Sequence, residues 1–131
     1  MQSKQPDMQL PADFPEAYKA PFVEILNLGM TRTPEELRLG VKVHLSRIAK
    51  TARTTEFDED VAVGIGQGLL SLLELPLKEE PQRSWVLAAV SYYVNMDDEE
   101  PDFTPGGFHD DAAVFNAVAR AMGKPELVVQ V

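Results

Sequence analysis

The residues with the clearest chemical potential are carboxylates near the end of the chain. Seven of the twenty-one Asp and Glu residues lie within residues 97–111, and Asp98, Asp102, Asp110 and Asp111 bracket one segment rich in proline and glycine. Hard cations such as Mg²⁺ or Ca²⁺ need several oxygen ligands that converge on one point. These four residues are therefore a candidate metal site, and Mg²⁺ or Ca²⁺ is the candidate cofactor.

The spacing of these carboxylates does not match the common calcium-binding loop. When an EF-hand is numbered from Asp98, Phe103 takes the place of the required glycine. His109 takes the place of the bidentate glutamate that closes such a loop. The metal hypothesis therefore rests on the number of carboxylates and not on a motif.

A second interpretation of the segment needs no metal. Asp110 would cap the helix that follows, and Asp111 would lie on the positive end of its dipole. Phe103 and Phe108 would fold under the loop as apolar plugs. The sequence favours this interpretation, in which the loop is architecture first and chemistry second.

The segment also resembles a known family. A helix that ends in an aromatic residue is followed by an aspartate, a Pro-Asp-Phe, a second proline, a glycine and a paired Asp-Asp, and here these parts are Tyr93, Asp98, Pro101-Asp102-Phe103, Pro105, Gly107 and Asp110-Asp111-Ala112-Ala113. Over residues 92–118 the chain resembles the YkvA-like bacterial domain family, which has no established chemistry. Met96, Glu99, Glu100 and a shorter glycine loop depart from the family pattern. The resemblance implies a helical hairpin.

No other part of the sequence predicts catalysis. His109 lies beside two aspartates, which could orient an imidazole as a general base, but no nucleophile or second histidine is near in sequence. We therefore expect His109 to be a surface residue and His44, beside an apolar stripe, to be a core residue. Because the chain has no cysteine, thiolate zinc sites, disulfides and cysteine nucleophiles are excluded. We assign no catalytic residue.

Length and composition predict one domain. The chain has 131 residues, of which 44% are hydrophobic, and this is the usual size of a single globular domain. It has no run of about 18 apolar residues, so we expect no signal peptide and no membrane span. A chain without cysteine suits a reducing compartment, and we expect a cytoplasmic location.

Charge is distributed unevenly along the chain. The net charge is -9, yet residues 32–53 carry six of the twelve Lys and Arg residues. An acidic surface repels phosphate backbones and anionic lipid, so nucleic acid and the inner membrane leaflet are poor partners. We expect the six cations to spread over several faces of a helix, as a solvated surface with an ion-pair role.

Capping signals and apolar spacing define the elements. Thr33-Pro34-Glu35-Glu36 is a capping-box pattern, and Asp13-Phe14-Pro15-Glu16 is a second one. The predicted helices are a short turn from residue 13, a bend and a run over 21–28, then 34–52, 58–75, 81–95 and 110–122. Inside the helix predicted over 58–75, Gly64, Gly66 and Gly68 each weaken helix propensity. Gly64 and Gly68 share a face, so we expect a neighbouring helix to approach closely over them.

These elements predict an all-α, single-domain bundle of about five helices with an extended C-terminal arm. Residues 1–12 would be a frayed tail, 13–126 the helical domain and 127–131 the apolar arm. The function we favour is a non-catalytic protein-interaction or structural module, with a protein partner or self-association. The alternatives are a divalent-metal-binding protein or metal-dependent enzyme using the 97–111 carboxylates, and an acidic, immunity-like inhibitor of a basic partner.

Overall fold

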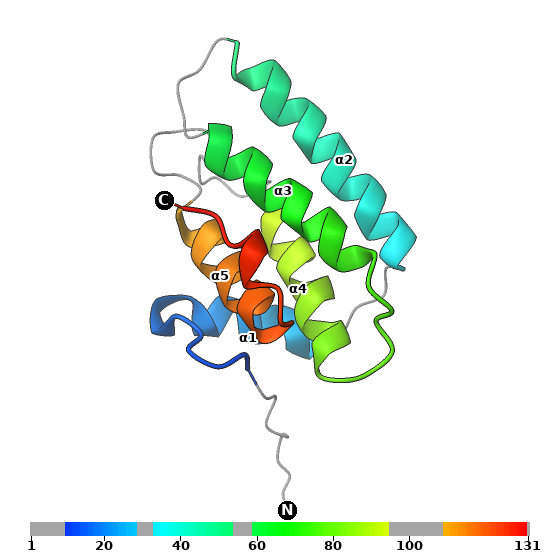
Figure 1. Ribbon diagram of the computed structural model, residues 1–131, viewed down its shortest axis with the longest axis vertical. Helices are drawn as coiled ribbons and strands as arrows, with labels where there is room; N and C mark the ends of the chain where they lie inside the picture. The colour runs from blue at the N-terminus through cyan, green and yellow to red at the C-terminus, as the bar shows by residue number, and fades with distance from the viewer. Residues whose placement is uncertain (1–9, 29–32, 54–58, 95–108, 131) are drawn as a thin grey trace, which may run out of the picture.

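The computed structural model describes residues 10–28, 33–53, 59–94 and 109–130. These residues form five α-helices, two 3₁₀ turns and no strand, which confirms the all-α prediction (Figure 1). The helices are α1 (Lys19–Leu28), α2 (Pro34–Thr51), α3 (Glu59–Leu73), α4 (Gln82–Val94) and α5 (His109–Ala121). None of the described helices has both the length and the apolar character that a membrane crossing requires.

A capping box and a proline determine where α2 begins. The Thr33 side chain accepts a hydrogen bond from the Glu36 amide at 3.1 Å, and the Glu36 carboxylate accepts one from the Thr33 amide at 3.0 Å. Both halves of the predicted capping box are therefore present, and Pro34 stands at the first helical position, where its missing N–H costs nothing. The helix ends at Thr51, one residue before the predicted end.

The first turn of the domain differs from its prediction. The 3₁₀ turn η1 (Glu16–Tyr18) follows Pro15 and has no side-chain cap, so Asp13 does not close a capping box. Asp13 instead adopts φ 60°, a left-handed conformation that aspartate tolerates better than most residues. Helix α1 follows η1 without a gap and includes Pro21 in its first turn, where an N–H has no helical partner to lose. Leu10 and Pro11, from the predicted tail, are half-buried and buried.

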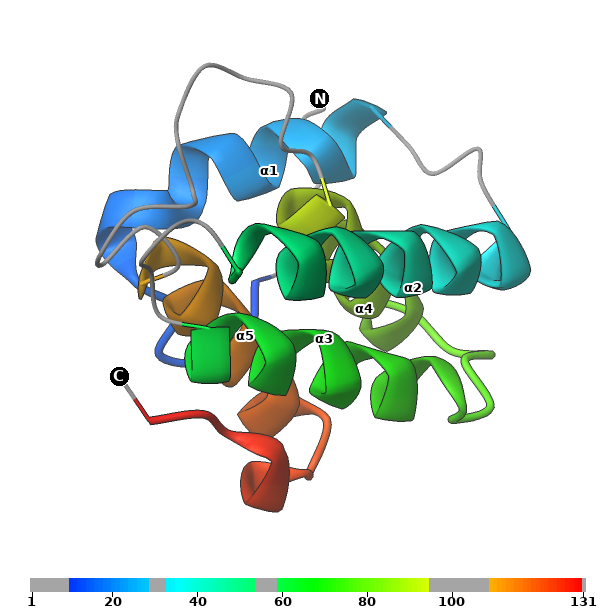
Figure 2. The same cartoon turned by 90° about the horizontal axis from the view of Figure 1, so that it is seen from above.

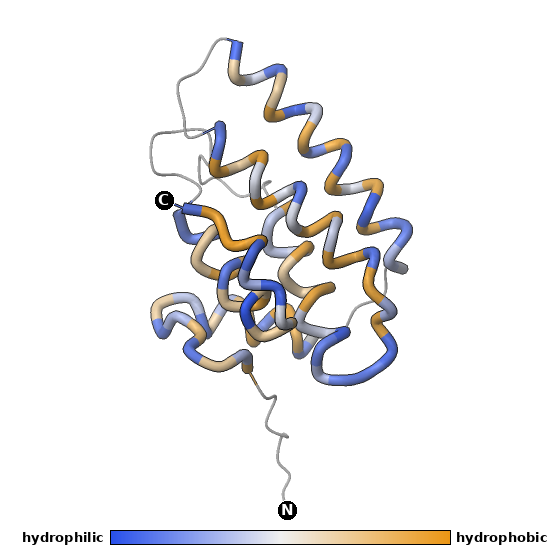
Figure 3. The backbone as a smooth tube through the Cα atoms, in the orientation of Figure 1, coloured by the Kyte–Doolittle hydropathy of each residue, from blue (hydrophilic) through white to orange (hydrophobic). Residues whose placement is uncertain are grey.

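Helix α4 occupies the centre of the bundle. It packs against α1, α2, α3 and α5, and it lies between them in both views (Figures 1 and 2). Every residue in the run Trp85–Val90 is buried, and the hydropathy colouring shows the contrast with α2, whose polar and apolar residues alternate (Figure 3). A helix that is apolar on nearly all sides has no face for solvent, which is why it becomes the core element.

The three glycines of α3 each receive a different neighbour. A Cβ at Gly68 would fall on the Phe115 ring of α5, with Cε1 only 3.0 Å away, and one at Gly64 would lie 2.9 Å from Cγ1 of Val129 in the arm. At Gly66 a Cβ would meet Cδ2 of Leu45 at 2.6 Å and the Tyr93 hydroxyl at 2.7 Å. The predicted approach of a neighbouring helix is confirmed at Gly68, where α5 packs, whereas the neighbour of Gly64 is the arm and not a helix. Gly66 is approached by α2 and α4.

The end of α5 and the arm are held by specific hydrogen bonds. Gly123 adopts φ 76°, the Lys124 amide donates to Ala119 at 2.9 Å and the Gly123 amide donates to Arg120 at 3.0 Å, which is a Schellman motif. After the 3₁₀ turn η2 (Pro125–Leu127), the Asn116 side chain donates to the Val129 carbonyl at 3.0 Å and accepts from the Val129 amide at 2.9 Å. The arm therefore packs on its own bundle.

We predict that Gly68→Ala destabilises the protein by roughly 1–3 kcal/mol, because the new methyl group would overpack the Phe115 ring. The gain in helix propensity is at most about 1 kcal/mol and does not offset this cost. Urea unfolding measures the change. In a double-mutant cycle, Phe115→Leu should absorb part of it, and additive effects of the two substitutions would contradict a direct contact.

Candidate functional site

Two of the four predicted metal ligands lie among the described residues. Asp110 and Asp111 stand in the first turn of α5, which begins at His109, while Asp98 and Asp102 lie outside the described residues. Since the helix begins one residue earlier than predicted, Asp110 is part of the first turn and not its cap. Its Oδ2 accepts a hydrogen bond from the Tyr92 hydroxyl at 3.3 Å. Asp111 is buried.

Burial and nearby carboxylates keep the phenols of Tyr92 and Tyr93 protonated. Burial, followed by the negative charges of Asp110 and Asp111, raises the pKa of Tyr92 well above its ordinary value. Burial and then Asp111 raise the pKa of Tyr93 in the same way. The tyrosines can therefore donate hydrogen bonds but do not supply a nucleophile. No group of three or more His, Cys, Asp or Glu side chains that could hold a metal occurs among the described residues, and the four-carboxylate site stays a prediction.

His44 is buried beside Tyr93 in the core. Its ring lies edge-on to the Tyr93 ring, with centroids 4.6 Å apart, and only 4% of the residue is exposed. The Tyr93 hydroxyl donates to the Ala62 carbonyl at 2.8 Å, which links α4 to α3. Burial, with a smaller contribution from the positive charge of Arg47, lowers the pKa of His44 from 6.5 to about 4. The predicted core role of His44 is confirmed, and His109 is exposed as predicted.

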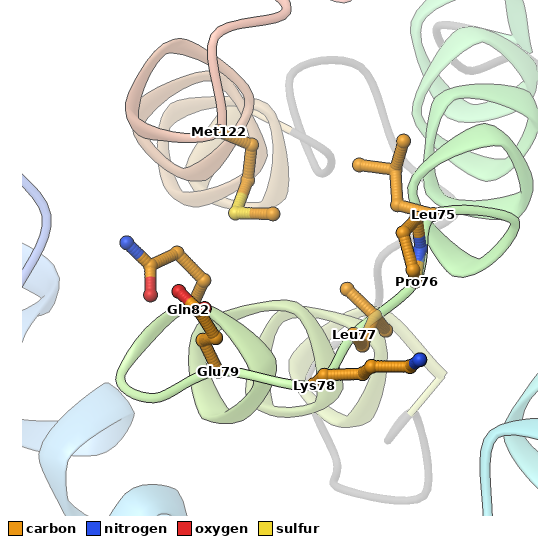
Figure 4. A pocket seen from close by; sticks show the side chains of 7 residues that line it. All are labelled: Leu75, Pro76, Leu77, Lys78, Glu79, Gln82 and Met122. Atoms are coloured by element: carbon orange, nitrogen blue, oxygen red, sulfur yellow. The ribbon is translucent and has the colours of Figure 1, made fainter.

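A shallow cavity of about 570 Å³ opens where α3 leads into α4 (Figure 4). Leu75, Leu77 and Met122 supply most of its apolar lining, and Gln82 comes from the start of α4. The Gln82 Oε1 is buried and accepts no hydrogen bond from the described residues. Lys78 and Glu79 also line the cavity, and their side chains extend in different directions (Figure 4).

The outward side of α2 carries large apolar side chains that are exposed to solvent. Leu39 is 62% exposed and Val43 is 60% exposed, and these are the exposed large hydrophobic residues among those described. Lys42, Arg47 and Lys50 are exposed on the same side of the helix. We call these five residues the outer face of α2.

The cations of this segment lie as the sequence predicts. Helix α2 buries Leu37, Val41, His44 and Ile48 on its inner side, and the described cations other than Arg38 are exposed to solvent around the rest of the helix. Arg38 lies at the edge of the inner side and pairs with Glu74, the residue directly after α3, at 2.9 Å, in agreement with the expected ion-pair role. The signal that could have revealed the outer face is the placement of Leu39 and Val43 off the apolar stripe.

A comparison with protein-family models, curated proteins and solved structures finds no match to this chain. The resemblance to the YkvA-like family stays a prediction. Of its motif, the structure describes Tyr93 near the end of α4 and Asp110–Ala113 at the start of α5, and these two helices pack against each other.

We predict that acid destabilises the protein through His44. Because the folded pKa of about 4 lies below the unfolded value of 6.5, protonation favours the unfolded chain. The stabilisation is complete above pH 6.5 and is lost as the pH falls from 6.5 towards 4. Between pH 7 and pH 5 the loss should be about 2 kcal/mol in urea unfolding.

Two variants isolate the contribution of His44. His44→Leu and His44→Gln should each have a flatter dependence of unfolding free energy on pH in this interval, whatever their stability at pH 7. His109→Gln is the matched control, because it removes the other histidine of the sequence, which is exposed. An unchanged slope in both His44 variants would show that other groups cause the acid sensitivity.

Proposed function

We propose that this chain is a non-catalytic protein-interaction module that binds a helical protein segment on the outer face of α2. The observation that carries this proposal is the exposure of Leu39 and Val43, one turn apart on a helix whose other large apolar residues are buried or half-buried. Residues at positions i and i+4 lie side by side on a helix, so the two side chains form one apolar spot. Apolar spots rimmed by polar residues are typical of protein contacts.

Charge around the spot supports a partner of defined chemistry. Lys42, Arg47 and Lys50 surround it, and residues 37–53 contain no acidic residue, although the whole chain carries -9. A partner helix with apolar residues at its centre and carboxylates towards one end would match both properties. Complementary charges of this kind fix the orientation of a partner and speed its association.

A synthetic helical peptide tests the proposal. The probe carries Leu at two positions four residues apart, with Glu residues flanking one end, and the readout is the change in amide chemical shifts of the labelled protein. We expect saturable binding, with shifts concentrated on α2 between Leu39 and Lys50. The combined variant Leu39→Ser and Val43→Ser should weaken binding at least about tenfold, because it removes the apolar spot.

Two controls accompany the probe. Val23→Ser on α1 makes the same kind of change at a half-buried valine and should leave the affinity unchanged. A scrambled peptide of the same composition tests whether charge alone causes binding. Shifts that map to another surface, or equal binding of the scrambled peptide, would contradict the proposal.

A further inference from the structure

A row of residues along α2 that includes Val43 and Arg47 of the outer face is complementary to a second copy of itself. Glu36, Gly40, Val43 and Arg47 follow one another at steps of four, three and four residues, so they form one row along the helix. Glu36, Val43 and Arg47 are exposed and Gly40 is half-buried. In sequence the row has an acid at one end, a base at the other, and a glycine and a valine between them.

No contact among the described residues explains the glycine at position 40. A glycine inside a helix costs up to about 1 kcal/mol relative to alanine. The glycines of α3 are each required by a neighbour that a Cβ would strike, whereas a Cβ at Gly40 would meet no atom of the described residues within 4 Å. Gly40 therefore leaves a shallow depression on α2, directly beside the exposed side chains of Leu39 and Val43.

Two antiparallel copies of this row are complementary. When a second α2 runs in the opposite direction across the first, Glu36 of each copy faces Arg47 of the other, and Val43 of each copy faces Gly40 of the other. The valine fills the depression that the glycine leaves, and the charges pair at both ends. The same patch serves both subunits, which is the arrangement of a two-fold symmetric dimer.

We infer that the partner of the outer face is a second copy of this chain, joined through antiparallel α2 helices. This inference rests on the proposed protein-interaction function and specifies the protein that binds α2. The row spans eleven residue steps, or roughly 16 Å of helix, which places the contact at the small end of interface sizes. The dimer is therefore weak and reversible, with a dissociation constant in the range of about 10 µM to 1 mM.

Sedimentation equilibrium on the full chain over this concentration range tests the inference. The parent chain should show a monomer–dimer equilibrium that weakens as salt screens the Glu36–Arg47 pairs. Arg47→Glu and Glu36→Lys should each be monomeric throughout, because each substitution places like charges opposite one another. Gly40→Leu should raise the dissociation constant at least about tenfold, because it fills the space that Val43 needs.

The decisive sample is an equimolar mixture of the R47E and E36K variants. Neither variant pairs with itself, but each carries charges that match the other at both ends of the row, so the mixture should form a heterodimer. A failure of folding cannot produce this rescue. Arg120→Glu on α5 is the matched control, since it makes the same charge change away from α2 and should dimerise like the parent chain.

The outcomes separate this inference from the proposed function. A parent chain that stays monomeric up to about 1 mM, or a dimer that R47E and E36K leave intact, overturns the inference. If the parent chain is monomeric but the synthetic helix still binds α2, the protein-interaction function stands and only the second copy is wrong. If the chain is monomeric and the synthetic helix does not bind, both fail.

Discussion

Close packing against the three glycines of α3 is the contact on which the rest of the structure depends. Through Gly66 the helix meets Leu45 of α2 and Tyr93 of α4, through Gly68 it meets Phe115 of α5, and through Gly64 it meets Val129 of the arm. Each glycine lowers the helix propensity of α3, and the close packing that the glycines permit offsets this local cost in stability. Protein interiors are dense enough that side chains at these positions would displace all four neighbours.

The position of α2 follows from this packing. Its inner side is held by Leu45 over Gly66, by the edge contact of His44 with Tyr93 and by the Arg38–Glu74 pair at one margin. Because these contacts fix the rotation of the helix about its own axis, they also decide which residues point outward. The exposure of Leu39 and Val43 is thus a consequence of how the opposite side is bound, and it is this exposure that supports a role in protein contact.

The acidic residues at the start of α5 have structural roles. Asp110 accepts a hydrogen bond from Tyr92, and the buried Asp111 lies in the first turn, where the helix dipole favours negative charge. These roles agree with the interpretation in which the carboxylates of this segment are structural. The hypothesis of a cation held by Asp98, Asp102, Asp110 and Asp111 stays a prediction, since Asp98 and Asp102 lie outside the described residues.

The sequence by itself determined features that depend on residues a few positions apart. The Thr33 capping box, the end of α5 at Gly123 and the bounds of the long helices to within two residues belong to this group, because their hydrogen bonds join near neighbours. The central place of α4 was also predictable, since a helix apolar on nearly all sides cannot face water. Only the tertiary structure decided that Asn116 binds Val129, that His44 meets Tyr93 and that Leu39 and Val43 face outward. Those contacts join distant parts of the chain, so they depend on how the helices are rotated against one another, and no local signal specifies that rotation.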